Sequence, residues 1–156
     1  MSAGDAIINF YDRIVTLLQD STRADIEAVN NKYITFCTRP STSDEYGYPR
    51  VEVLPDEGEI LYDTGAKQGI IMRAIVLVLK DRPDDTLETS TDKTLEIAND
   101  VYAELMLNRK VADRWNFLKC GVPKAQDARG AEWIENPDGF SWTTVDVEAR
   151  YTITPT

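Results

Sequence analysis

The sequence predicts an α+β fold, in which a mixed or antiparallel β-sheet is packed by two main amphipathic helices and completed by the C-terminal strand. Three observations support this prediction. Residues 145–154 alternate between apolar and polar side chains, a pattern typical of a strand with one buried face and one solvent-facing side. Residues 5–20 and 92–108 each carry apolar side chains at helical spacing. The chain of 156 residues has no linker-like stretch, so we expect a single domain over residues 1–156.

The first helix is expected over residues 5–20. The side chains predicted to face the core are Ile7, Phe10, Tyr11, Ile14, Val15, Leu17 and Leu18. A capping-box-like pattern at residues 22–25 predicts a short helical turn that ends before Asn30. Residues 33–37 are rich in β-branched and aromatic side chains and are expected to form a strand. Residues 38–49 are rich in turn-forming residues and are expected to form a loop.

The sequence pattern in the middle of the chain predicts the central strands of the sheet. Residues 51–54 and 59–62 are expected to form two short strands, separated by a turn at residues 55–58. Residues 70–80 are apolar on both faces except at Arg73, which is typical of a central strand that is covered on both sides. A solvated loop is expected after it, at residues 81–85.

The second helix is expected over residues 92–108. Its predicted buried stripe consists of Leu95, Ala98, Val101, Tyr102, Leu105 and Met106. Residues 111–130 are expected to be irregular, and residues 131–135 are expected to form a strand. Asn136 to Gly139 is a strong turn signal, and the closing strand is expected from about Ser141 onward.

Composition excludes several kinds of chemistry. The chain has no histidine, which removes Ser-His and Cys-His nucleophiles and histidine metal ligands. Cys37 and Cys120 lie beside apolar segments, which favours two buried thiols over one disulfide and suits a reducing compartment. No run of residues is long and apolar enough to span a membrane, and the N-terminus lacks the pattern of a signal peptide.

The formal net charge is −10, from 27 acidic and 17 basic residues. A surface of this charge repels phosphate backbones, so ordinary nucleic-acid binding is disfavoured. It does not exclude a pore through which DNA slides without adhering. A basic cluster of Arg109, Lys110, Arg114 and Lys119 is surrounded by acids and does not predict nucleic-acid docking.

Asp63 begins a short motif, Asp-Thr-Gly-Ala, preceded by apolar residues. This motif resembles the signature of retroviral-type aspartic proteases, in which two chains each supply one aspartate and the pair activates a water molecule. The resemblance implies a catalytic Asp63 supported by Thr64 and Gly65. The alternative is a strand that ends in an Asp-Thr-Gly turn, which we favour because no later segment matches the rest of the protease pattern.

No metal site and no cofactor are predicted. Asp81, Asp84 and Asp85 could offer oxygen ligands, but the spacing lacks the glycine and glutamate of a calcium-binding loop. We interpret these acids as a solvated loop after a strand.

The order of predicted elements resembles that of the tail terminator proteins of tailed bacteriophages. The similarity lies in the layout: an amphipathic N-terminal helix, strands with a long loop, a long apolar central strand, a second helix and a closing strand that includes residues 145–153. The resemblance implies a homo-oligomeric ring, commonly of six subunits, that caps the tail tube and faces the head connector. It implies a structural virion protein, not an enzyme, assembled in the host cytoplasm, with DNA passing through the lumen. Alternatives are another head–tail neck or completion protein, or an unrelated adaptor domain.

Candidate contact residues follow from the long polar segments 38–50 and 56–69, which flank the predicted sheet edges and contain aromatic side chains. The expected ring or tube contacts are Tyr46, Tyr48, Pro49, Glu57, Glu59 and Lys67.

Overall fold

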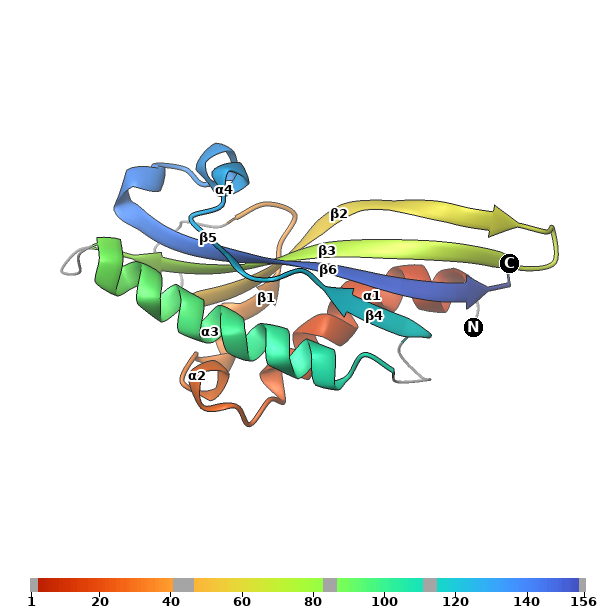
Figure 1. Cartoon of the computed structure of the whole chain (residues 1–156), viewed down its shortest axis with the longest axis horizontal. Coiled ribbons are helices and arrows are strands. Elements are labelled where there is room, and N and C mark those ends of the chain that lie inside the picture. Colours follow the sequence, from red (N-terminus) through yellow and green to blue (C-terminus); the bar gives the residue numbers. More distant parts are fainter. Residues whose placement is uncertain (1–2, 41–46, 83–86, 111–114, 155–156) are drawn as a thin grey trace.

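Six strands form one mixed sheet in the order β1-β2-β3-β6-β4, with β5 paired to β6 beside this path (Figure 1). The computed structural model describes residues 3–40, 47–82, 87–110 and 115–154. β1 runs parallel to β2, and the other pairs are antiparallel. The strands are β1 (Ile34–Phe36), β2 (Arg50–Asp63), β3 (Gln68–Asp81), β4 (Phe117–Cys120), β5 (Lys124–Ala125) and β6 (Phe140–Ile153). The α+β class predicted from the sequence is confirmed.

The two long helices match the two amphipathic stretches of the sequence. The helices are α1 (Ala3–Gln19), α2 (Ala24–Glu27), α3 (Leu87–Leu107) and α4 (Ala128–Trp133), and short 3₁₀ turns cover Asn31–Tyr33 (η1) and Pro137–Gly139 (η2). None of the helices in the described ranges is long and apolar enough to cross a membrane.

β3 is the centre of the sheet, as its two apolar faces predict. It pairs with β6 along its whole length, from Gln68 opposite Ile153 to Asp81 opposite Phe140, and with β2 on its other side. Its side chains alternate between two hydrophobic clusters, one on each face of the sheet. The alternation of β6 is also confirmed, because its apolar residues from Val145 to Ile153 are all buried.

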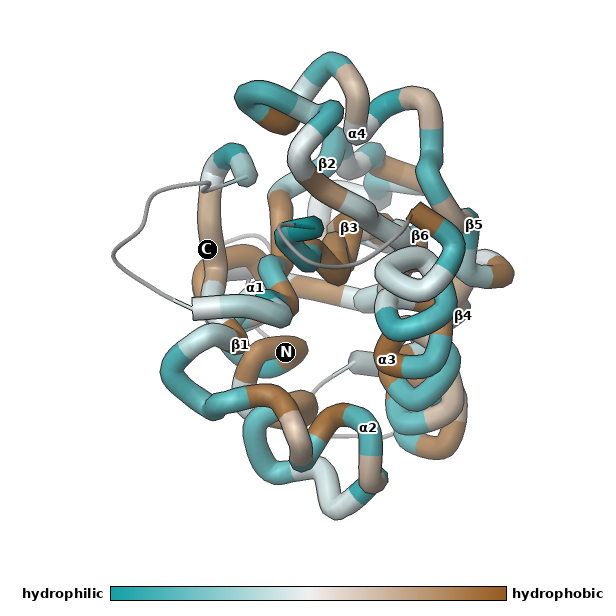
Figure 2. Tube along the Cα trace, turned by 90° about the vertical axis from the view of Figure 1, so that its left-hand side faces the viewer, coloured by the Kyte–Doolittle hydropathy of each residue, from teal (hydrophilic) through white to brown (hydrophobic). Residues whose placement is uncertain are grey.

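α1 and α3 cover the same face of the sheet (Figures 1 and 2). Phe10, Ile14 and Leu18 of α1 are fully buried there, because they recur at helical spacing on one side. Ile7, predicted to belong to this buried face, is instead half exposed. Both cysteines are free thiols, as expected, but only Cys120 is buried and Cys37 is partly exposed.

The opposite face is covered over only part of its length. Figure 1 shows α4 above one end of the sheet, where Leu77, Leu79 and Trp142 form the second hydrophobic cluster. The Trp142 indole nitrogen donates to the backbone oxygen of Asp127 (2.8 Å), and its ring lies so close to Gly130 that a side chain there would collide with it. Toward the other end, no helix of the described chain lies above β2, β3 and β6.

β2 corrects the sequence-based prediction of two short strands separated by a turn. It is one strand of 14 residues, with register shifts between Asp56 and Glu59 and between Ile60 and Tyr62. β1 pairs with β2 only as far as Val53, so Pro55 lies where the outer side of β2 has no strand partner in the described chain and its missing N–H is tolerated. Gly58 fits the first irregularity, because a Cβ there would meet the Ile71 carbonyl oxygen.

Residues 111–135 differ most from expectation. The segment predicted to be irregular contains β4 and β5, and the strand predicted at 131–135 is wrong, because residues 128–133 form α4. Asp127 begins this helix by accepting a hydrogen bond from the Arg129 backbone N–H (3.1 Å). Residues 111–114 and the acidic loop positions 84 and 85 lie outside the described residues.

Candidate functional site

The outer part of β2 is exposed along its whole length. All nine residues from 55 to 63, which we call the arm, have exposed side chains although they belong to a paired strand. Ile60, Leu61 and Tyr62 are 63%, 47% and 47% exposed. A strand normally hides one of its faces, so a segment that shows apolar groups on both is typical of a surface that a partner covers.

The arm also presents a free edge. β3 pairs with it on one side, and no strand of the described chain pairs with it on the other. An open edge carries a row of unpaired N–H and C=O groups, which another strand can extend. Tyr62 folds back over Gly69, and its hydroxyl lies 3.5 Å from the Thr152 hydroxyl, which helps to hold the arm on the sheet.

Arg73 ties the arm to the middle of the sheet. Its guanidinium donates to Glu59 (2.8 Å), to Glu148 on β6 (3.1 Å) and to the backbone oxygen of Glu57 (3.2 Å). The hydrogen bond to Glu59 is the largest cause that raises the pKa of Arg73, and Glu148 adds to it. Because one guanidinium contacts three acceptors at once, it fixes the orientation of the arm more strongly than a lysine could.

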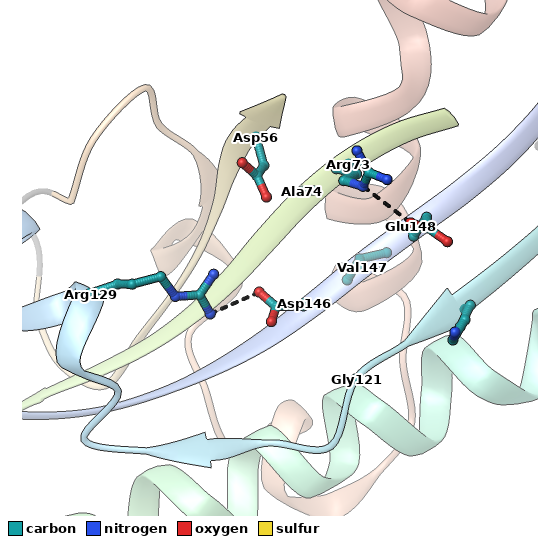
Figure 3. A pocket seen from close by; sticks show the side chains of 9 residues that line it. Asp56, Arg73, Ala74, Gly121, Arg129, Asp146, Val147 and Glu148 are labelled. Atoms are coloured by element: carbon teal, nitrogen blue, oxygen red, sulfur yellow. Dashed lines mark hydrogen bonds and ion pairs between the residues drawn. The ribbon is translucent and has the colours of Figure 1, made fainter. Parts of the chain in front are cut away.

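A groove of about 320 Å³ lies on the uncovered sheet face beside Arg73 (Figure 3). Arg129 reaches into it from α4 and pairs with Asp146 at 2.9 Å, while Lys119 borders it from β4. Asp56 lines the groove from the arm. Three acidic and three basic residues therefore share this groove, and most of these charges neutralise one another.

Asp127 anchors the helix that borders the groove. Its carboxylate accepts from the Arg129 guanidinium at 2.6 Å and from the Thr144 hydroxyl at 2.7 Å. The hydrogen bond from Arg129 is the main reason that the pKa of Asp127 lies well below its ordinary value, and the same bond raises the pKa of Arg129. These pairs hold α4 on the sheet.

The groove offers polar and charged contacts. Arg73 is paired with Glu148 and Arg129 with Asp146. The described residues contain no group of three or more acidic or cysteine side chains arranged to hold a metal ion.

Asp63 lies at the exposed tip of the β2–β3 hairpin. Its carboxylate accepts from the Gly65 backbone N–H (2.8 Å) and from the Gln68 amide (3.0 Å), and these two bonds, that of Gln68 first, lower its pKa. Gly65 has a φ of 83°, which suits glycine in a tight turn. This geometry favours the turn interpretation of the Asp-Thr-Gly motif over the protease interpretation.

The predicted contact residues divide into two groups. Glu57, Glu59 and Lys67 all belong to the β2–β3 hairpin and are exposed. Tyr48 is not at a free loop tip, because its ring packs against Phe140 at 5.5 Å between centroids and beneath the Arg50 guanidinium.

The other two predicted contact residues are Pro49 and Tyr46. Pro49 is half buried and follows a cis peptide bond. Tyr46 lies outside the described residues.

The sequence patterns do not predict the arm as one exposed segment. They also do not predict the ion pairs of Arg73 and Arg129. One signal is present: residues 55–63 contain four acids and three consecutive large side chains, with no simple alternation. The pairing of Arg129 with residues of β6 has no local signal, since it depends on the packing of α4.

No protein-family model matches the chain, and no curated protein matches it in sequence.

Proposed function

We propose that this protein is a structural assembly protein of a tailed bacteriophage, the tail terminator, which forms a ring on the open end of the tail tube and joins it to the head connector. The observation that carries the proposal is the arm. A strand that exposes three consecutive large side chains, Ile60, Leu61 and Tyr62, beside a free edge is unfavourable in a lone subunit, and neighbouring subunits or a tube would cover it.

The order of elements also supports the proposal. An N-terminal amphipathic helix, a long hairpin, a second helix and a closing strand follow one another as the resemblance to tail terminators implies. Such a subunit works by surface burial, without chemistry. Its neighbours would cover the arm, the ring would cover the tube end, and further tube subunits would find no place to add.

The net charge of −10 fits a ring through which DNA passes. Like charges on the lumen and on the phosphate backbone prevent adhesion, so the ring would guide DNA without binding it specifically. The finished ring would remain in the virion, between tail and head.

Two measurements test the proposal. Size-exclusion chromatography with light scattering should find, besides the 17.6 kDa chain, a species near six times that mass, alone or on tubes. Electron microscopy of tail tubes, assembled from the tube protein of the same genome, should show rings at tube ends and shorter tubes when the protein is present.

A chain that stays monomeric and leaves tube growth unchanged would contradict the proposal. Binding to head connectors with no effect on tubes would instead identify another neck or completion protein.

A further inference from the structure

The uncovered end of the sheet has two outer margins, and they carry opposite charges. One margin is the arm, which contributes Asp56, Glu57, Glu59 and Asp63 and contains no basic residue. The opposite margin is formed by β4 and the residues that follow α3 (Figure 1). We call Arg109, Lys110 and Lys119, which are all exposed, the basic margin.

Lys119 lies on β4, whereas Arg109 and Lys110 belong to the segment that follows α3. The Leu118 backbone N–H donates to the Arg109 carbonyl oxygen (2.8 Å), so the chain after α3 runs beside β4. Lys119 stands opposite Glu148 in the β4–β6 register, but the carboxylate of Glu148 is already paired with Arg73.

The positive charges of this margin are available to a partner. Within the ranges that the structure describes, Arg109, Lys110 and Lys119 form no ion pair. In a chain with a net charge of −10, three unpaired cations along one edge favour an acidic partner surface.

Apolar groups accompany the charges on both margins. The arm exposes Ile60, Leu61 and Tyr62, and the other side exposes Leu107, at the end of α3, and Val122, which follows β4. Leu107 and Val122 are each 74% exposed. Apolar contacts at the centre with complementary charges around them are the usual composition of a protein interface.

We infer that the arm of one copy docks on the basic margin of the next copy, head to tail. This inference rests on the proposed ring and names the two surfaces that would build it. The two surfaces are different parts of the chain, so the contact is heterologous, and repeated contacts of this kind close into a ring when the rotation between copies permits. Pairing of two arms is disfavoured, because it would bring eight carboxylates together, four from each copy.

Charge reversal tests the inference on the full chain. Glu57→Lys changes an arm carboxylate that has no side-chain partner in the described residues, and Lys110→Glu changes an exposed cation outside the strands. Light scattering over a dilution series at low salt measures the concentration at which rings form. Each single variant should raise that concentration about tenfold, and the combined variant should return it to within about threefold of the unaltered chain.

Mixing separates this arrangement from others. An equimolar mixture of the two single variants should form rings that neither forms alone at the same concentration. In that mixture the altered arm of Glu57→Lys meets the altered margin of Lys110→Glu, and the unaltered arm of Lys110→Glu meets the unaltered margin of Glu57→Lys, so opposite charges face each other at both contacts. Glu27→Lys on α2 makes the same charge change on an exposed residue away from both margins and should leave assembly unchanged.

The inference is overturned if both single variants form rings at the ordinary concentration, or if the combined variant gains nothing. Stronger association between Glu57→Lys and the unaltered chain than within either alone would show arm-to-arm pairing and would also overturn it. If all variants form rings at the ordinary concentration, the proposed function still holds and only the inference fails. If the unaltered chain forms no ring on its own or on tubes, the inference and the proposed function are both refuted.

Discussion

The hydroxyl of Thr94 on α3 lies 2.9 Å from the hydroxyl of Thr143 on β6, and neither side chain is accessible to solvent. Thr94 also donates to the Thr91 carbonyl oxygen at 2.9 Å. A hydroxyl has a single proton to donate, so Thr143 must donate to Thr94. The helix and the sheet are therefore joined by a polar contact between two buried side chains.

This direction predicts unequal effects of two similar substitutions. Thr94→Val leaves the buried hydroxyl of Thr143 without an acceptor and should lower the free energy of unfolding by about 1–3 kcal/mol. Thr143→Val removes a donor but leaves the bond from Thr94 to Thr91 intact, so it should cost about 1 kcal/mol or less. Urea unfolding followed by circular dichroism measures both values. A larger cost for Thr143→Val would show that the proton lies the other way.

The arm should matter for assembly and not for folding. Replacing Ile60 and Leu61 together by serine should change the free energy of unfolding by no more than about 1 kcal/mol, because both side chains are exposed. The same change should weaken ring formation at least about tenfold, since apolar anchors dominate interface energies. Chemical unfolding and light scattering measure the two effects.

Ile8→Ser on α1 is the matched control, because Ile8 is 77% exposed and lies on a different element. If the control weakens assembly as much as the arm variant does, the arm has no special part in the interface.

Asp127 should give the chain a defined acid sensitivity. The pKa of Asp127 in the folded chain lies below the ordinary value of 3.8, chiefly because of its hydrogen bond from Arg129. The ionised carboxylate therefore stabilises the fold at every pH above 3.8. This stabilisation is lost as pH falls through the lower, folded pKa. Asp127→Asn should cost about 1–3 kcal/mol at neutral pH while keeping an acceptor at the start of α4.

The difference between Asp127→Asn and the unaltered chain should stay constant above about pH 5 and shrink below about pH 4. Unfolding curves of the variant and of the unaltered chain, measured across this pH range, test the prediction. A difference that does not change with pH would mean that the charge of Asp127 contributes nothing.

Both cysteines should be slow to react in the folded chain. Burial raises the pKa of Cys37 to about 11 and that of Cys120 to about 12, so little thiolate exists near neutral pH. A colourimetric thiol reagent should label the unfolded chain at both positions at once and the native chain far more slowly, with Cys120 slowest. Immediate labelling of both thiols in the native chain would contradict this.

Asp63→Asn separates the turn from the protease interpretation. Asparagine keeps one acceptor for the Gly65 backbone N–H, so the hairpin should persist and the free energy of unfolding should change little. Peptide cleavage by the unaltered chain that disappears in this variant would restore the protease interpretation. The assay uses a peptide library at mildly acidic pH.

The long periodic elements can be predicted because their patterns are local. α1, α3 and β6 follow from apolar spacing, since each buries a stripe or face, and β3 follows from an apolar run that is buried on both faces. The arm cannot be predicted in this way. Pro55 and Gly58 are ordinary turn signals, and here they are accommodated in a strand only because β3 supplies a partner and the outer side is free.

The site is predictable only in part. The structure places Glu57 and Glu59 on the outer part of β2 and Lys67 in the turn after it, and their role as contacts stays a prediction. The strand prediction at residues 131–135 fails because a short apolar window fits a helix such as α4 equally well. The contacts of Arg129 with Asp127 and Asp146 depend on that helix, so the charged groove has no signal in the sequence.

The full-length pairing of β3 with β6 has a consequence for the kinetics of folding. The two strands are separated in sequence by all of α3, so a long loop must close before the centre of the sheet gains any contact, and folding should be slow for a chain of this size. The β2–β3 hairpin can form earlier from adjacent residues. Until β6 arrives, the apolar β3 offers an open template to other molecules, so dilute refolding should give a higher yield than concentrated refolding.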